Sequence, residues 1–215
     1  MNRLFLWFVK ITGWPIQLFY YRKKVITIDN DKSLRKIKGG ALIVSNHTSI
    51  YDYPLIMYTF LKRSIRLLVA EVMYNKNWFL STFVKLIGGI KVDRETYDFA
   101  FLTKMIDCLK KGQVGLVFPE SRLPKETEIG HLIEFKPSYV YIALEAGVPI
   151  IPIYTNGIYG KKKKVFKSRA KIVIGKPINV NELLDDKLDE KEYINNINNY
   201  VKEKIEELKN YLEKE

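Results

Sequence analysis

The segment Ala41–Asp52, with the sequence ALIVSNHTSIYD, places an apolar run directly before a polar turn. Residues 41–44 are all apolar, as expected of a strand buried on both faces of a parallel sheet. The polar part contains His47 and Asp52, and Ser49 precedes the aspartate with the S-x-x-[DE] spacing of a capping box. The segment therefore predicts a strand, a turn and the start of a helix.

The same alternation continues along the chain of 215 residues, of which 47% are hydrophobic. Apolar runs bounded by turn residues predict strands at Ala41–Ser45, Ile65–Ala70, Gly89–Val92, Val114–Phe118, Ile150–Tyr154 and Ala170–Ile174. The stretches between them predict helices at Tyr51–Leu61, Trp78–Leu86, Tyr97–Lys111 and Pro137–Ala146. Strands alternating with helices predict an α/β fold, a single domain over 26–180 with a mixed, largely parallel sheet flanked by helices.

Three polar clusters directly follow predicted strands. They are Asn46-His47, Asp93-Arg94 and Glu120-Ser121-Arg122. In open α/β sheets, binding sites gather in the loops beyond the carboxyl ends of the strands. The order of the elements therefore predicts that these clusters converge on one site.

The two ends of the chain differ from this body. Residues 1–25 are apolar and aromatic, with Lys10 inside and a predicted break near Gly13-Trp14-Pro15, and the stretch is too short and interrupted for a spanning helix. We expect two short helices in the membrane interface, with Trp7, Trp14, Tyr20 and Tyr21 at headgroup level and Arg22-Lys23-Lys24 on anionic lipid. The alternative is a helix buried on the domain's own core. Residues 181–215 predict a charged amphipathic helix.

The formal charge of +12 is unevenly distributed. Residues 181–215 carry −5, which leaves +17 on residues 1–180. A body this basic suggests an anionic partner, which can be nucleic acid, an acidic membrane surface or a phosphorylated substrate. No aromatic RNA-binding motif or basic recognition helix is apparent in the sequence, so no nucleic acid partner is expected.

His47 and Asp52 can form a catalytic pair only if the chain bends between them. On a regular helix, five residues turn through about 500°, which leaves the two side chains about 140° apart. If His47 lies in the turn and Asp52 in the first helical turn, the carboxylate can reach the imidazole and leave its outer nitrogen free to accept a proton. The alternative is that Asp52 is only a first-turn acid.

Four blocks in order resemble the glycerolipid acyltransferases. They are HTSIYD with its His-x4-Asp spacing, GGIKVDR at Gly88–Arg94, LVFPESR at Leu116–Arg122, and ALEAGVPIIPI at Ala143–Ile153. The third block is usually written FPEGTR in this family. The resemblance covers roughly residues 35–175.

The resemblance implies acyl transfer from acyl-coenzyme A or an acyl carrier protein to lysophosphatidate, forming phosphatidate at the cytoplasmic face of the cell membrane. His47 would be the general base, which contributes about 10²–10⁴-fold in such reactions, and Asp52 would orient it. The expected substrate-binding residues are Lys91, Arg94, Glu120, Ser121, Arg122 and Pro149. No metal or cofactor is expected.

The third block departs from the family pattern, because only Ser121 separates Glu120 from Arg122. Either a shortened loop still brings Arg122 to the phosphate, or Lys125 substitutes, or the acceptor is a different lysolipid or lipid-linked molecule. A hydrolase and a non-catalytic lipid-binding or nucleic-acid-binding protein also stay open as alternatives. His131, in the loop after this block, is expected at the surface or the edge of the substrate site rather than as a second base.

Overall fold

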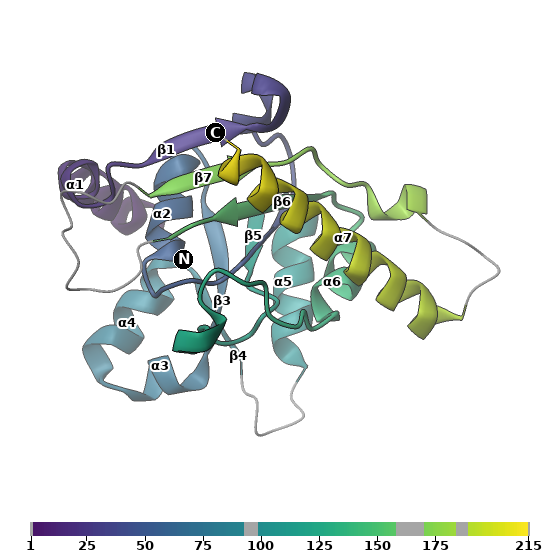
Figure 1. Cartoon of the computed structure of the whole chain (residues 1–215). Coiled ribbons are helices and arrows are strands. Elements are labelled where there is room, and N and C mark those ends of the chain that lie inside the picture. Colours follow the sequence, from purple (N-terminus) through teal and green to yellow (C-terminus); the bar gives the residue numbers. More distant parts are fainter. Residues whose placement is uncertain (1, 93–98, 158–169, 184–188, 215) are drawn as a thin grey trace.

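The computed structural model describes residues 2–92, 99–157, 170–183 and 189–214. One seven-stranded sheet forms the centre, with helices on both faces (Figure 1). Its strands are β1 (Lys24–Thr27), β2 (Ala41–Ser45), β3 (Ile65–Ala70), β4 (Gly89–Val92), β5 (Val114–Val117), β6 (Ile150–Thr155) and β7 (Lys171–Ile174). The helices are α1 (Arg3–Tyr21), α2 (Asp52–Thr59), α3 (Glu71–Asn75), α4 (Trp78–Ile87), α5 (Ala100–Lys110), α6 (Ser138–Ala146) and α7 (Glu190–Glu213).

The strand order is β1-β7-β6-β2-β5-β3-β4, and every pairing is parallel except that of β6 with β7. The central strand β2 is completely buried between β6 and β5. Burial on both faces explains why its sequence is continuously apolar instead of alternating. The expected mixed, largely parallel sheet flanked by helices is confirmed.

Alternate side chains of β2 enter two separate cores. Leu42 and Val44 belong to the core beneath α5, α6 and α7, whereas Ile43 packs with α2 on the other face. The turn after β2 is therefore anchored from both sides of the sheet. This rigidity matters because that turn carries His47.

All six predicted strands are present, with ends within one residue of the prediction. The strand β1 was missed because it is only four residues long, begins with Lys24, and pairs with distant β7. The short helix α3 was also missed, since five residues give little periodicity. The segment Lys24–Thr27 straddles the expected boundary at residue 25.

The expected break in the N-terminal segment was wrong, because α1 runs through Pro15 as one helix. Gly13 has another role: a Cβ atom there would lie 2.1 Å from the hydroxyl oxygen of Tyr58, so glycine lets α2 approach α1 closely. The Tyr58 hydroxyl then donates to the Val9 carbonyl at 3.0 Å. Among the described residues, no helix has both the length and the apolar character needed to cross a membrane.

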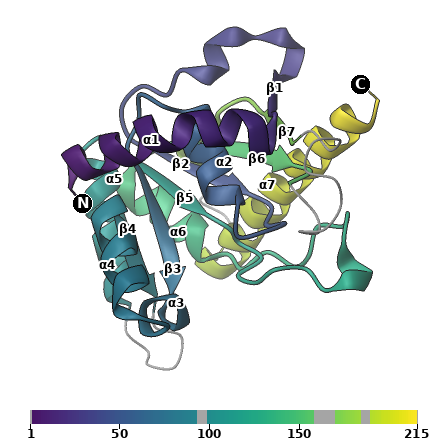
Figure 2. The ribbon, with the colours of Figure 1, turned by 90° about the vertical axis from the view of Figure 1, so that its left-hand side faces the viewer.

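Lys10 fastens the middle of α1 to the loop after α2. Its buried ammonium donates to the carbonyl oxygens of Leu61 at 2.8 Å and Arg63 at 2.6 Å. Burial lowers the pKa of Lys10 to about 8. The inner side of α1 thus docks on the domain, and α1 and α4 share the side that faces the viewer in Figure 2.

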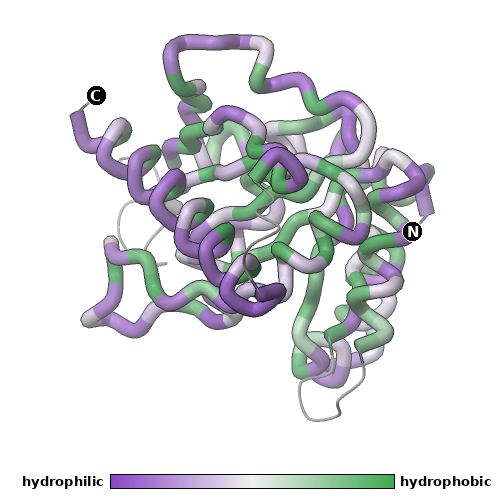
Figure 3. The backbone as a smooth tube through the Cα atoms, turned by 90° about the vertical axis from the view of Figure 1, so that its right-hand side faces the viewer, coloured by the Kyte–Doolittle hydropathy of each residue, from purple (hydrophilic) through white to green (hydrophobic). Residues whose placement is uncertain are grey.

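The C-terminal amphipathic helix is confirmed as α7, which begins at Glu190 after an Asp189 cap. Its buried residues recur at helical spacing: Tyr193, Ile197, Asn198, Val201, Ile205, Leu208 and Leu212. They extend the core over β6 and β7. Hydrophilic residues cover much of the remaining helix surface (Figure 3).

Candidate active site

The candidate site begins where β2 ends, at the turn that joins it to α2. Nδ1 of His47 lies 2.9 Å from Oδ2 of Asp52, which is the first residue of α2. The imidazole is 20% exposed, whereas the carboxyl group is fully buried. The chain therefore bends as a His–Asp contact requires, and the partner carboxylate places the imidazole proton on Nδ1.

Asp52 accepts hydrogen bonds from the whole turn. Besides His47, its carboxylate accepts the backbone N–H groups of Thr48 at 2.6 Å and Ser49 at 2.8 Å, and the Thr48 hydroxyl at 2.8 Å. The Ser49 N–H bond is half of a capping box, so Asp52 both caps the turn and contacts the histidine. The two interpretations of Asp52, as a capping acid and as the partner of His47, are therefore compatible.

The turn after β5 packs directly against the histidine. The ring of Phe118 stacks on the imidazole, with ring centroids 4.2 Å apart and planes inclined by 13°. Buried Glu120 accepts the backbone N–H of His47 at 2.9 Å and that of Ile133 at 3.3 Å. Burial raises the pKa of the Glu120 carboxyl group, although both N–H donors oppose the shift.

The end of β6 completes the frame around the turn. The amide side chain of Asn46 bonds both to the carbonyl of Thr155 at 2.9 Å and to its N–H at 2.8 Å. Gly157 follows with a φ of +60°, and a Cβ atom there would lie 1.7 Å from the Thr48 hydroxyl oxygen. Sequence reasoning missed Thr48, Thr155 and Gly157. The Asn-Gly turn at 156–157 was the available signal.

The predicted residues on β4 are less directly placed. Lys91 forms an ion pair with Glu71 at 2.5 Å, which joins the end of β4 to the start of α3. Arg94 and its neighbour Asp93 lie outside the described residues. The structure therefore assigns a partner to Lys91 and leaves the role of Arg94 a prediction.

Arg122 forms a two-pronged ion pair with Glu128. Its Nη1 and Nη2 atoms lie 2.6 and 2.7 Å from the two carboxylate oxygens. The guanidinium, with the backbone N–H of Lys125, lowers the pKa of Glu128 to about 2. Both side chains are partly exposed, so this pair forms a rim of the loop rather than part of the buried frame.

Ser121 occupies the left-handed region with φ of +60°. This conformation is unfavourable for a residue with a Cβ atom, and glycine adopts it readily. The structure thus explains the glycine of the FPEGTR pattern at this position. Pro149 lies elsewhere: its carbonyl accepts the N–H of Leu42 near the start of β2, so the structure does not bring it to the His47 edge.

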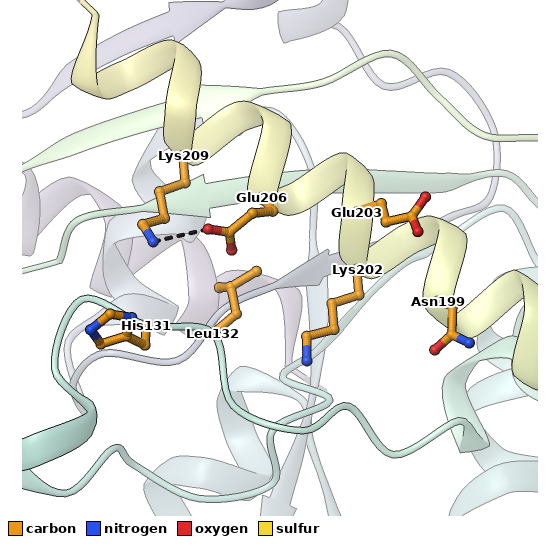
Figure 4. A pocket seen from close by; sticks show the side chains of 7 residues that line it. All are labelled: His131, Leu132, Asn199, Lys202, Glu203, Glu206 and Lys209. Atoms are coloured by element: carbon orange, nitrogen blue, oxygen red, sulfur yellow. Dashed lines mark hydrogen bonds and ion pairs between the residues drawn. The ribbon is translucent and has the colours of Figure 1, made fainter.

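His131 lines an open pocket between its own loop and α7 (Figure 4). The same pocket contains both positive and negative side chains, including the ion pair between Lys209 and Glu206. In the described ranges, no cluster of three or more His, Cys, Asp or Glu side chains could hold a metal ion. The chemistry available at His47 is transfer of a proton to Nε2 from a bound hydroxyl group or water.

Several known proteins are similar in sequence to this chain. A family model described as Acyltransferase matches residues 25–156. The 1-acyl-sn-glycerol-3-phosphate acyltransferase of Bacillus subtilis is 24% identical over 175 residues, covering 81% of this chain and 84% of that protein. A probable enzyme of the same name from Mycoplasma genitalium is 28% identical, covering 86% and 73%.

One solved structure shares the fold. The 1-acyl-sn-glycerophosphate acyltransferase of Thermotoga maritima matches with a TM-score of 0.62 at 21% identity. The match covers 94% of this chain and 79% of that one.

Proposed function

The chain belongs to the acyltransferase family, and we propose that it esterifies lysophosphatidate with a fatty acyl group from an acyl thioester. The observation that carries this proposal is the contact between His47 and buried Asp52 at the carboxyl edge of the sheet. The identity of the acceptor is inferred from the names of the distant relatives, which are 1-acyl-sn-glycerol-3-phosphate acyltransferases.

In the proposed reaction, the acceptor hydroxyl attacks the thioester carbonyl while His47 Nε2 removes its proton. The new C–O ester bond forms as the C–S bond breaks, and the proton passes from the imidazolium to the leaving thiolate. Asp52 holds the required tautomer and stabilises the imidazolium. No group on the protein needs to be acylated, which fits the lack of a G-x-S-x-G segment.

Phe118 and Glu120 act in this proposal by positioning the base. The stacked phenyl ring restricts rotation of the imidazole, and Glu120 ties the His47 backbone to the loop at Ile133. Both residues lie in the loop after β5, so their contacts hold this loop and His47 in a fixed arrangement. Glu120 is therefore a positioning residue in the first instance.

Arg122 is the proposed phosphate ligand among the described residues. A guanidinium binds a phosphate in the same forked geometry that it now offers to Glu128. Exposed ion pairs exchange partners at low cost, so an acceptor phosphate can replace Glu128. The shortened third block favours one second candidate, acylation of a different lysolipid or lipid-linked acceptor.

We propose that the protein works at the cytoplasmic surface of the cell membrane, held there by α1. The outer side of this helix exposes seven large apolar residues: Leu4, Trp7, Phe8, Ile11, Trp14, Leu18 and Phe19. The buried Lys10 side fixes the helix to the domain, so the apolar side points outward. Acyl-coenzyme A or an acyl carrier protein would supply the acyl group from the aqueous phase.

The decisive test is phosphatidate formation from lysophosphatidate and labelled acyl thioesters, comparing wild type with His47→Ala. We expect a loss of about 10²–10⁴-fold in kcat for a folded variant. Equal rates in both proteins would contradict the role of His47. Product from another lysolipid only would identify the second candidate, and release of free fatty acid would indicate hydrolysis.

A further inference from the structure

A second apolar surface lies at the tip of the α3–α4 hairpin, away from the His47–Asp52 contact. Val72, Trp78 and Phe79 are 77%, 79% and 68% exposed. The two aromatic rings contact each other edge to face, with centroids 6.2 Å apart. Such a cluster of exposed large apolar side chains marks an interaction surface on a globular protein.

The folding of α4 explains why these rings point outward. Asn77 caps the helix by accepting the N–H of Leu80, so Trp78 and Phe79 occupy its first turn. Val84 and Ile87, five and eight residues after Phe79, are the residues that α4 buries. The tip residues therefore contribute no buried side chain to the core, and folding does not account for their apolar character.

Charge indicates what covers the tip. The hairpin and the strand after it, residues 71–92, contain three lysines, Lys76, Lys85 and Lys91, and one acidic residue, Glu71, which pairs with Lys91. Residues 1–28, which include α1, contain five basic residues and no acidic residue. Tryptophan rings beside lysines suit the interface of a bilayer that contains anionic lipid.

The helix α4 is connected to α1 at its carboxyl end, opposite the tip. The N–H of Asn2 bonds to the carbonyl of Leu86 at 3.0 Å, and the rings of Phe5 and Phe83 make an edge-to-face contact. These contacts fix the carboxyl end of α4 to the amino end of α1, and both helices occupy one side of the molecule (Figure 2). The tip and the outer side of α1 are therefore held in a fixed arrangement relative to each other.

We propose that the α3–α4 tip is a second membrane contact, which inserts Trp78 and Phe79 into an anionic bilayer together with the outer side of α1. The proposal extends the membrane location proposed above for α1. A single helix would leave the domain free to roll about the helix axis, whereas two contacts fix its orientation. Because α3 directly follows β3, the second contact lies at the same sheet edge as the His47 turn.

Quenching of Trp78 fluorescence by brominated lipid tests this contact directly. The chain has three tryptophans, so the variant Trp7→Phe/Trp14→Phe leaves Trp78 as the single reporter. With vesicles of phosphatidylcholine and phosphatidylglycerol in equal amounts, we expect a blue shift and quenching by brominated acyl chains. An unchanged spectrum on vesicles that bind the protein would overturn the proposal.

Partitioning measurements give the second readout. We expect Trp78→Ser/Phe79→Ser to reduce binding to the anionic vesicles by about tenfold or more, since two partly inserted rings are lost. Tyr141→Ser, at a residue 40% exposed on α6, is the matched control and should bind as wild type does. Equal binding by all three proteins would contradict the second contact.

Two further outcomes separate this proposal from its alternatives. Trp78→Ser/Phe79→Ser should keep its activity on lysophosphatidate in detergent micelles. If the wild type has no such activity, the proposed reaction is refuted, but the fluorescence result on membrane contact still stands. If an acidic acyl carrier protein shifts the Trp78 fluorescence and vesicles do not, the tip binds a protein partner and the proposed membrane contact is wrong.

Discussion

The turns after β2 and β5 lie at the same edge of the sheet but hold their functional groups differently. In the first, the Asp52 carboxylate is fully buried and accepts hydrogen bonds from His47, Thr48 and Ser49. In the second, Arg122 and Glu128 form a partly exposed ion pair. The proposed base is therefore fixed by the fold, while the rim that would meet the acceptor can exchange partners.

The largest expected effect concerns the buried turn. Asp52→Asn removes the carboxylate that faces His47 Nδ1, so the outer nitrogen is no longer held as the acceptor. We expect kcat to fall by about 10²–10⁴-fold with the fold retained, as judged by circular dichroism. Ser49→Ala is the control, because it removes a 3.4 Å contact with Asp52 and an acceptor for the Tyr51 N–H but leaves the carboxylate that faces His47. Comparable activity in Asp52→Asn and wild type would contradict the proposed role of the buried carboxylate.

Glu120 links the two turns, and its variant is expected to have the next largest effect. Glu120→Gln offers one oxygen where two N–H donors now bond, so we expect about a tenfold loss in kcat. The pH dependence of the unfolding free energy tests the effect of burying the charged Glu120 carboxylate. Since burial raises the pKa of Glu120, the native state holds more protons than the unfolded state as pH rises from the usual value of 4.5, and stability falls.

The pH dependence can be measured by denaturant unfolding of both proteins. Wild type should lose stability relative to Glu120→Gln as pH rises through the raised pKa, by at most about 1.4 kcal/mol per pH unit. Below the usual glutamate pKa the difference between the two proteins should be constant. Parallel curves at all pH values would show that the burial of this carboxyl group is not costly.

A smaller effect is expected at the exposed rim, and it should affect KM more than kcat. Arg122→Gln should raise the KM for lysophosphatidate about tenfold, because a charged hydrogen bond is lost. Glu128→Gln frees the guanidinium and should lower the same KM. Steady-state kinetics with lysophosphatidate measure both. If neither variant changes KM, Arg122 has only a structural role.

The smallest effect should come from Ser121. Ser121→Gly relieves the left-handed backbone but adds freedom to the unfolded chain, so we expect a net gain of about 0.5 kcal/mol in unfolding free energy. Ser121→Ala keeps the Cβ atom and should give no gain. A similar stability for all three proteins would mean that the backbone at residue 121 is unstrained.

These two turns also mark how far the sequence predicts the structure. The six predicted strands are local apolar runs, so their ends could be predicted almost to the residue. The His–Asp contact was one of two possibilities that the spacing left open, and the chain bends as this possibility requires. By contrast, three contacts depend on tertiary geometry. They are the pairing of Arg122 with Glu128, the close approach of Gly157 to Thr48 and the stacking of Phe118 on His47.

The N-terminal helix shows the same limit. Gly13 and Pro15 predict a break from local propensity, but the close approach of Tyr58 requires the glycine and the helix continues through the proline. Pro149 was assigned from a motif that continues across a strand, and only the register of β6 on β2 reveals which end it occupies. Tertiary contacts therefore override local signals at these positions.

The pairing of β1 with β7 also governs the order of assembly. Lys24 on β1 is matched with Lys171, so the strand that follows α1 must await a partner almost 150 residues further along the chain. Contacts so distant in sequence form slowly, and during synthesis the amino-terminal part emerges long before its partner. The apolar helix is thus available to the bilayer before its edge strand can close. With the membrane location proposed above, we expect the protein to complete its folding at the bilayer surface.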